Sequence, residues 1–187
     1  MNYYPLLLDL KGKKCVVIGG GKVAERKAVS LLKSGAVVMV VSPGVTKTLA
    51  LLKSQQRIRC IIAHYHKKFL KGAFLAIIAT DDQQLNRKAA GDSQRAGILT
   101  NVVDSPALSN FIVPSVIAKK GLIISISTSG QVPALSKRIR KDITSLLIPS
   151  YAQSLTILKR IRRELKKKYT NPKTRARILK RLVNIKI

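Results

Sequence analysis

The sequence is poor in acidic, aromatic and cysteine residues, and each shortage narrows the classes of protein that it can encode. Eight Asp and Glu stand against 36 Lys and Arg among 187 residues, which gives a net charge of +28. Tryptophan is absent and aromatic residues make up only 4%, so the stacking platforms typical of single-strand nucleic-acid grooves are missing. The two cysteines, each inside an apolar run, form neither a disulfide framework nor a zinc site.

Long apolar runs are missing as well. No uncharged run approaches the ~20 residues that a membrane-spanning helix needs, and the chain lacks the basic start of a signal peptide. His64 and His66 lie close together but have no second pair of ligands nearby, so we interpret them as surface residues rather than metal ligands. We therefore expect a soluble cytoplasmic protein with no resident metal and no membrane partner.

The positive charge extends along the whole chain and is densest at its C-terminal end. Residues 149–187 contain 13 Lys and Arg and a single acid, Glu164. Such a field attracts polyanions, which include nucleic acids, acidic lipids and small molecules with many carboxylates. A solvated basic surface without a partner explains the same excess equally well. Charge alone therefore does not identify a ligand.

The hydrophobic 46% of the chain is arranged in short runs that alternate with helical stretches. Several runs are almost unbroken and rich in Val and Ile, as is typical of strands covered on both faces of a parallel sheet. The alternation over residues 1–113 predicts a doubly wound α/β sheet. Strands are expected at 15–18, 37–41, 58–63, 74–79, 98–103 and 122–127, with 111–113 as a weaker seventh, and helices at 22–33, 46–54 and 84–95.

Beyond Pro114 the pattern changes. Residues 114–148 predict a short helix at 115–119, a strand, and a helix that begins at Pro133. This segment is too small for a core of its own, so we expect it to pack on the sheet or against a second subunit. Residues 149–187 predict a basic tail of two amphipathic helices, separated by a turn at Asn171 and Pro172.

A glycine-rich turn is the strongest single motif. Gly19-x-Gly21-x-x-Ala24 directly follows an apolar strand and opens a helix, which is the pattern of a dinucleotide-binding turn. Gly19 permits the tight turn, Gly21 leaves room for a pyrophosphate, and Ala24 lets the helix pack closely on the strand. The free N–H groups at the start of the helix favour phosphate charge. An ordinary glycine-rich turn between strand and helix is the alternative.

The end of the second strand departs from the usual dinucleotide pattern. An acid normally holds the ribose hydroxyls there, but this sequence has Ser42-Pro43-Gly44 and no acid between Glu25 and Asp81. The hydroxyl of Ser42 or backbone groups can replace the acid, whereas the neighbouring Lys47 equally suits a 2′-phosphate. The spacing therefore does not choose between NAD and NADP.

Polar residues also follow the later strands, where ligands of open α/β sheets bind. Thr80 is expected to touch the cofactor, while Asp82 suits a helix N-cap and a cofactor contact equally. Asp104, one of only eight acids, is either a turn former or a group that accepts a proton from the substrate. The hydroxyls of the run 125–130 can donate to the carboxylates of a ligand.

These motifs together resemble the precorrin-2 dehydrogenase family of siroheme biosynthesis, which includes the amino-terminal region of siroheme synthases. The resemblance covers nearly the whole chain, and its motifs occur in the family's order. The matching stretches are 17–27, 79–82, 101–104, 110–115 and 125–135.

The resemblance implies a Rossmann-type fold and NAD-dependent oxidation of precorrin-2 to sirohydrochlorin. It implies a division into an NAD-binding domain (1–113), a dimerisation and substrate region (114–148) and a basic helical tail (149–187), with homodimers formed through the middle region. Some members of the family also insert Fe²⁺ into the product. The alternative is a binding module for nucleic acid that senses NAD and uses the basic tail, although the few aromatic residues argue against it.

The candidate site residues combine these motifs with the family's pattern. Asp104 is the candidate catalytic residue. The candidate substrate-binding residues are Asn101, Ser127, Thr128 and Ser129. The candidate cofactor-binding residues are Gly19, Gly21, Lys22, Val23, Ser42, Pro43, Gly44 and Thr80.

Overall fold

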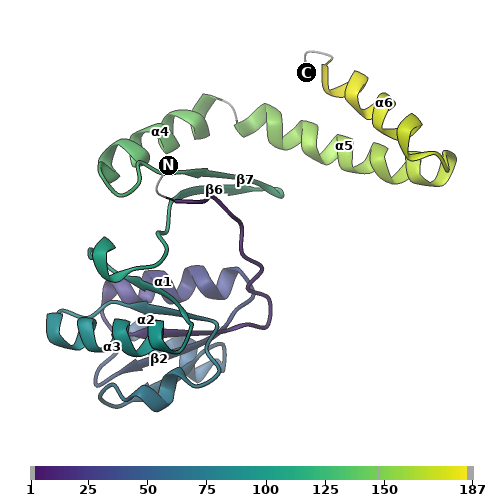
Figure 1. Ribbon diagram of the computed structural model, residues 1–187. Coiled ribbons are helices and arrows are strands. Elements are labelled where there is room, and N and C mark those ends of the chain that lie inside the picture. Colours follow the sequence, from purple (N-terminus) through teal and green to yellow (C-terminus); the bar gives the residue numbers. More distant parts are fainter. Residues whose placement is uncertain (1–2, 147, 185–187) are drawn as a thin grey trace. The chain divides into compact units, whose positions relative to one another are not determined.

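The apolar runs of the first half of the chain form a five-stranded parallel sheet, as a computed structural model that describes residues 3–146 and 148–184 shows (Figure 1). The strands lie in the order β3-β2-β1-β4-β5, and Val17 at the centre of the sheet is in register with Val40 and Ile77. Their bounds are β1 (Lys14–Ile18), β2 (Val37–Ser42), β3 (Arg59–Ile62), β4 (Leu75–Ile78) and β5 (Leu99–Val102).

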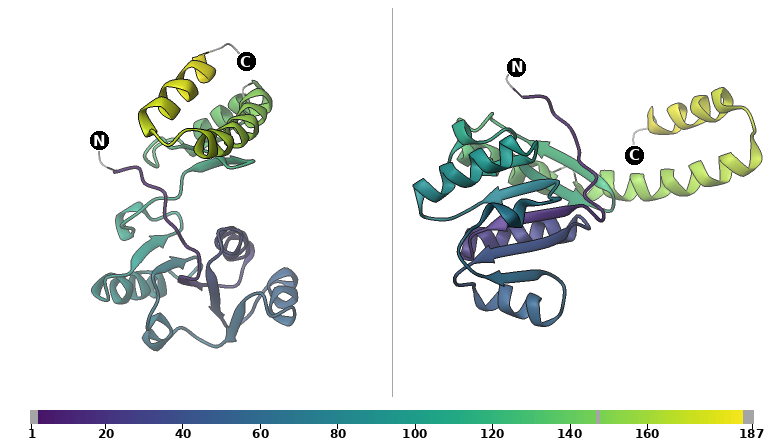
Figure 2. Two further views of the ribbon diagram at one scale, coloured as in Figure 1. Left: turned by 90° about the vertical axis from the view of Figure 1, so that its right-hand side faces the viewer. Right: turned by 60° about the horizontal axis from the view of Figure 1, so that its bottom comes forward.

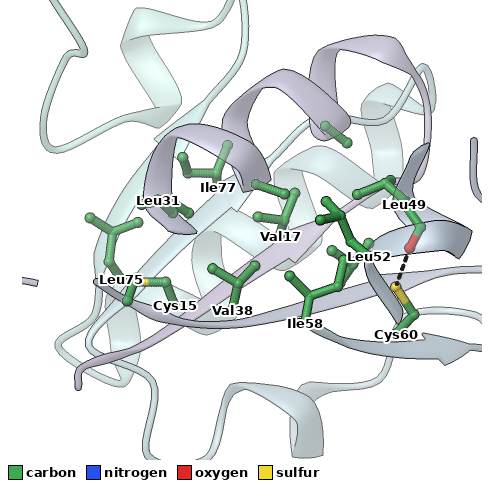
Figure 3. Packing of buried hydrophobic residues seen from close by; sticks show 14 of the residues in the cluster. Cys15, Val17, Leu31, Val38, Leu49, Leu52, Ile58, Cys60, Leu75 and Ile77 are labelled. Atoms are coloured by element: carbon green, nitrogen blue, oxygen red, sulfur yellow. Dashed lines mark hydrogen bonds between the residues drawn. The ribbon is translucent and has the colours of Figure 1, made fainter. Parts of the chain in front are cut away.

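Helices cover both faces of this sheet, so the expected doubly wound α/β fold is confirmed. The helices are α1 (Lys22–Lys33), α2 (Lys47–Ser54) and α3 (Gln83–Arg95), with short 3₁₀ turns η1 (Lys67–Leu70) and η2 (Pro106–Leu108). One face packs α1 and α2 against the strands through Leu31, Leu49 and Leu52 (Figure 3), and the other packs α3 through Ala89 and Ala90. Both faces are therefore buried, which explains the unbroken apolar strands.

The strand order reverses between β1 and β4. Chain connections from β1 run through α1 to β2 and β3 on one side, and those from β4 run through α3 to β5 on the other. In open α/β sheets such a reversal opens a crevice at the carboxyl ends of the two central strands, where ligands bind. A ligand site is therefore expected at the turns that follow β1 and β4.

The chain divides after Val113, and residues 114–187 form a second unit. It begins with an antiparallel hairpin of β6 (Ser115–Lys119) and β7 (Leu122–Ile126), followed by α4 (Pro133–Leu146), α5 (Ile148–Lys168) and α6 (Pro172–Asn184). The short helix expected at 115–119 is wrong, because these residues pair with β7 instead. The weaker strand candidate at 111–113 is also wrong, since this segment is irregular.

Within the second unit, α4 lies along one face of the hairpin and α6 folds back beside α5 (Figure 2). Ile117 is buried between the hairpin and α4, where Ile143 packs against it. Arg175 closes the turn between α5 and α6 by donating to the carbonyl oxygens of Tyr169 and Thr170 at 2.7 and 2.9 Å. Within the described ranges, no helix combines the length and apolar character needed to cross a membrane.

Candidate active site

The central strands of the first unit end side by side. The loops that follow them therefore lie together at the carboxyl ends of the strands. The amide of Gly19 donates to Val41 at 2.9 Å, and the amide of Ala79 donates to Ile18 at 2.8 Å. On the far side of β4, the amide of Val103 donates to Ile78 at 2.9 Å. The residues predicted for the cofactor and Asp104 therefore follow strands that end side by side.

Gly19 lies at the reversal point between β1 and β4. Its φ of +116° is a conformation that side chains rarely adopt. A β-carbon at this position would overlap the carbonyl oxygen of Ala79, the residue after β4. Glycine is therefore required both for the turn and for the close approach of the first and fourth strand ends.

Gly20 makes a second close approach that the sequence motif does not reveal. A β-carbon on Gly20 would overlap the carbonyl oxygen of Gly44 and approach the hydroxyl oxygen of Ser42 to 2.8 Å. The amide of Thr46 also donates to the carbonyl oxygen of Gly20 at 3.1 Å. The loops after β1 and β2 are thus packed backbone to backbone. The sequence signal for this contact is the second glycine-containing turn, Pro43-Gly44.

Gly21 differs from both, because apart from its neighbours in the chain no described atom lies within 4 Å of the place where its β-carbon would stand. It is the N-cap of α1 with φ −78°, and no side chain in the described residues caps the helix. The first N–H groups of α1 therefore lack helical partners. Ala24, one turn further, is fully buried against the strands. Open space in front of free N–H groups is the arrangement that suits a pyrophosphate.

The end of β2 supplies no carboxylate. Ser42 is half-buried, and Pro43 and Gly44 are exposed. The nearest acid in the sequence motif, Glu25, is engaged with the start of α2: the hydroxyl of Thr46 lowers the pKa of its carboxyl group, and Lys22 at 3.5 Å acts in the same direction. Glu25, which sequence reasoning did not single out, thus belongs to the same two-loop cluster as the glycines.

Thr80 follows β4, but its hydroxyl is already committed. It donates to the side-chain oxygen of Asn86 at 2.6 Å, and the Asn86 amide returns a bond to the carbonyl oxygen of Thr80 at 2.9 Å. Asp82 accepts from the amides of Gln84 and Leu85 at 2.8 and 3.0 Å, so its role as an N-cap of α3 is confirmed. The side chains of Thr80 and Asp82 are therefore both held by bonds within this loop and α3.

Asp104 is exposed in the turn after β5. Its φ of +58° is in the left-handed region, which Asp tolerates better than most residues. Val103, the residue before it, packs into the same core cluster as α1. Here the two interpretations of Asp104 are compatible: the residue forms the turn and leaves its carboxylate accessible.

Lys27 of α1 is the cationic neighbour of Asp104. Burial lowers the pKa of its ammonium group and the nearby Arg26 lowers it further, while the negative charge of Asp104 acts to raise it. Lys27 is half-buried, and among the described residues no acid approaches it within ion-pair distance. Sequence reasoning missed this residue, because only the fold brings α1 and the β5 loop together.

Asn101 has a mainly internal role in the structure. The residue is 8% exposed, and its side-chain amide donates to the carbonyl oxygen of Phe111 at 3.1 Å. Two further residues, which sequence reasoning missed, bind the free backbone amides of the outermost strand, β5. Asn110 accepts from the amide of Thr100 at 2.7 Å, and the Ser109 hydroxyl accepts from the amide of Val102 at 2.9 Å.

The three predicted hydroxyl residues belong to the second unit, in the turn between β7 and α4. Ser127 and Ser129 are exposed, and the Ser127 hydroxyl accepts from the amide of Ser129 at 3.0 Å. Thr128 accepts from the amide of Val132 at 3.1 Å at the start of α4. The turn is therefore ordered by its own hydroxyls and presents two of them to solvent.

Comparison with known proteins bears on the first unit directly. Residues 6–115, more than half of the chain, match a family model of NAD(P)-binding proteins. This stretch contains the glycine turn, the ends of β2 and β4, and Asp104.

Relatives cover the rest of the chain as well. The siroheme synthase of Methylobacillus flagellatus is 35% identical over 94% of this chain and 38% of its own length, and that of Saccharophagus degradans is 35% identical over 98% and 40%. The chain thus spans about two fifths of these relatives. Among solved structures, SirC, a precorrin-2 dehydrogenase, superposes with a TM-score of 0.84 at 27% identity, over 98% of this chain and 90% of SirC.

Proposed function

Because the chain belongs to the NAD(P)-binding family whose model spans residues 6–115, we propose that it is an NAD-dependent precorrin-2 dehydrogenase. The reaction converts precorrin-2 to sirohydrochlorin with loss of a hydride and a proton. The names of the similar proteins, siroheme synthase and SirC, support this substrate and pathway.

The observation that carries the proposal is the glycine turn after β1. Gly19 and Gly20 are required by backbone contacts, whereas Gly21 faces open space before the uncapped start of α1. This arrangement fits a dinucleotide, with its pyrophosphate on the N–H groups of Lys22 and Val23. The bound NAD supplies the acceptor for the hydride. Ser42, Pro43 and Gly44 line the adjacent loop and would hold the adenosine half.

Asp104 is the group that would take the proton. It is exposed at the strand-end edge where ligands of this sheet type bind, and it is the only acid in the 104–110 loop. The charge of Asp104 acts on the ammonium group of Lys27 in α1, so the carboxylate lies near a cationic side chain that would also attract an anionic substrate.

The basic character of the chain suits this substrate. Precorrin-2 is a polycarboxylate, and a net charge of +28 would concentrate it at the protein surface. In the second unit, the exposed hydroxyls of Ser127 and Ser129 and the basic residues Lys137 and Lys141 of α4 would bind its carboxylates.

We also propose that the second unit forms a homodimer. Its hairpin buries one face against α4 but leaves the other bare, with Val116 and Ile123 42% and 50% exposed. Leu135 and Val132 near the start of α4 are each 48% exposed. Ile117 is the single buried apolar residue of the unit's described core cluster. An apolar surface of this kind on so small a core is typical of a protein interface.

The decisive experiment is an anaerobic assay with precorrin-2 and NAD, followed by NADH absorbance and the sirohydrochlorin spectrum. We expect turnover with NAD and release of one NADH per sirohydrochlorin formed. The Asp104→Asn variant is expected to bind NAD as the wild type does and to lose most of its turnover. Undiminished turnover in this variant would remove Asp104 from the mechanism, and absence of NAD binding by the wild type would overturn the assignment.

Two further arms of the assay address the remaining alternatives. Addition of Fe²⁺ after oxidation tests whether the same protein inserts the metal, with Fe²⁺ as a substrate. Titration with duplex and single-stranded DNA at physiological salt tests the binding-module alternative, which predicts NAD-sensitive affinity. The dehydrogenase proposal predicts only weak, salt-dependent DNA binding that NAD does not alter.

A further inference from the structure

A pocket lies at the opposite edge of the parallel sheet from the glycine turn, where the strands begin. It is formed where the chain enters β4 and β5, by η1, the loop 71–73, the end of α3 and Ile98. Its volume is about 620 Å³, which is in the range of small-molecule sites. Because β1, β4 and β5 are parallel, their amino ends and carboxyl ends lie on different edges. The pocket is therefore separate from the proposed cofactor site.

The floor of this pocket is apolar. Leu70 and Ile98 are 4% and 5% exposed, and the apolar side chains of Ala73 and Ala96 line the pocket beside them. A fully charged small ion would gain nothing from such a floor. A ligand with a flat or compact apolar body would bury its surface there.

The rim of the pocket is cationic and uncompensated. Lys67, Lys68 and Lys71 line it, and none of the three has an ion-pair partner among the described residues. The one acid in the lining is Asp92, and its carboxylate is paired with the guanidinium group of Arg95 at 2.6 Å. The same carboxylate accepts a hydrogen bond from the hydroxyl of Tyr65 at 3.0 Å. The pocket thus has an excess of positive charge, and its only carboxylate is already paired and would not repel an anion.

The loop that carries these lysines is held in place from several sides. The Lys14 ammonium donates to the carbonyl oxygens of Phe69 and Lys71 at 3.2 and 2.6 Å, from the start of β1. His66 caps η1, because its Nδ1 accepts from the amide of Lys68 at 3.1 Å. The pocket is therefore preformed, which reduces the ordering cost of binding.

From these observations we infer that the pocket between η1 and the end of α3 binds an amphipathic organic anion. The ligand class is a small molecule with an apolar or aromatic body that carries a carboxylate, sulfonate or phosphate. Its body would rest on Leu70 and Ile98, and its charge would face Lys67 and Lys71. Such a ligand would occupy the protein together with the dinucleotide, since the two sites lie at opposite edges of the sheet.

The test uses 8-anilinonaphthalene-1-sulfonate as the probe, titrated by fluorescence into the full chain with NAD present in excess. Excess NAD occupies the proposed cofactor site, so probe binding there is suppressed. We expect saturable binding of one probe, weakened at least fivefold in the double variant Lys67→Glu/Lys71→Glu. The variant Ala96→Trp fills the pocket without changing its charge and is expected to weaken binding to a similar extent.

A charge-matched variant separates a pocket from general attraction. Lys53→Glu/Lys88→Glu removes the same charge at exposed lysines of α2 and α3 outside the pocket, and is expected to change affinity less than twofold. Equal weakening by the two double variants, or full affinity in Ala96→Trp, would overturn the inference. Circular dichroism and thermal unfolding confirm that each variant is folded. Because the readout is probe fluorescence, the result is independent of whether the protein oxidises precorrin-2.

Discussion

The backbone of Gly20 is packed against the carbonyl oxygen of Gly44, so closely that a β-carbon on Gly20 would overlap it. The loops after β1 and β2 are therefore joined by direct backbone contact, 24 residues apart in the chain. Gly21, the next residue, faces open space. Two adjacent glycines of one motif are thus required for different physical reasons. Alanine substitutions at Gly20 and Gly21 can distinguish these reasons.

Gly20→Ala is expected to destabilise the protein by about 1–3 kcal/mol, because the new methyl group forces two backbones apart. NAD affinity should fall with it, since the displaced loops form the proposed cofactor site. Denaturant unfolding measures the first effect, and calorimetric titration with NAD measures the second.

Gly21→Ala is the matched comparison. Its φ of −78° is allowed for alanine and its β-carbon meets no described atom, so the free energy of unfolding should change by less than about 0.5 kcal/mol. NAD affinity should nevertheless fall, because the methyl group occupies the space of the pyrophosphate. Equal stability losses in the two variants would contradict the packing described for Gly20.

Asp104→Asn is expected to lower the pKa of Lys27 further. In the wild type, burial and Arg26 already lower this pKa, and the Asp104 charge opposes them. Removal of a nearby negative charge disfavours the ammonium form. The pKa of Lys27 can be followed by NMR of its labelled side chain during a pH titration. The control is Asp142→Asn, at an acid of α4 that pairs with Arg138; it should leave the pKa of Lys27 unchanged.

Asn110→Ala is expected to cost about 1–3 kcal/mol of stability, because it leaves the amide of Thr100 without its partner at the edge of the sheet. Exchange of the Thr100 amide hydrogen should become faster than that of Thr100 in the wild type. Gln84→Ala, at an exposed position of α3, serves as the control and should change stability by less than about 0.5 kcal/mol. Unchanged exchange at Thr100 in Asn110→Ala would show that water replaces the side chain at no cost.

Tyr65→Phe tests the alkaline behaviour of the first unit. Burial raises the pKa of Tyr65 and its hydrogen bond to Asp92 raises it further. A phenol whose pKa is higher in the folded state stabilises the fold below about pH 10 and loses that contribution as the pH rises above it. The variant should lose about 0.5–1.5 kcal/mol at neutral pH and show a smaller fall in stability from pH 9 to 11. A parallel fall in both proteins would contradict this assignment.

The order of elements in the first unit was predictable because each signal is local. The strands are runs of Val and Ile covered on both faces, and helix starts are marked by Thr46 and Asp82, whose side chains cap α2 and α3. The glycine turn likewise carries its own spacing. The resemblance to siroheme synthases, drawn from these motifs, is confirmed by relatives that cover most of the chain.

The error at residues 115–119 has a physical cause. Five residues are too few to show a periodicity, and the segment becomes a strand only through its pairing with β7. The deciding feature is the two-residue turn Lys120-Gly121, where φ is +49° and +86°. A two-residue hairpin turn with positive φ at both residues usually has the sequence Asn-Gly or Asp-Gly. Because this turn has Lys120 at its first position, the sequence did not indicate a hairpin.

The parts of the site that were missed depend on contacts distant in sequence. Gly20 is constrained by Gly44, and Lys27 gains its significance from Asp104, 77 residues further along the chain. Neither relation can be recognised from a short stretch of sequence, because its two residues are far apart in the chain. The binding and catalytic roles of the candidate residues stay predictions until the variants above are measured.

The loop that follows β5 covers the outer edge of this strand, which affects how the sheet can pair with other chains. Ser109 and Asn110 occupy the outward amides of β5, so a foreign strand finds no free ladder on that side of the sheet. On the other side the sheet ends at β3, which offers only the four residues Arg59–Ile62. Edge-to-edge addition of a foreign strand is therefore blocked along β5 and limited to a short stretch along β3.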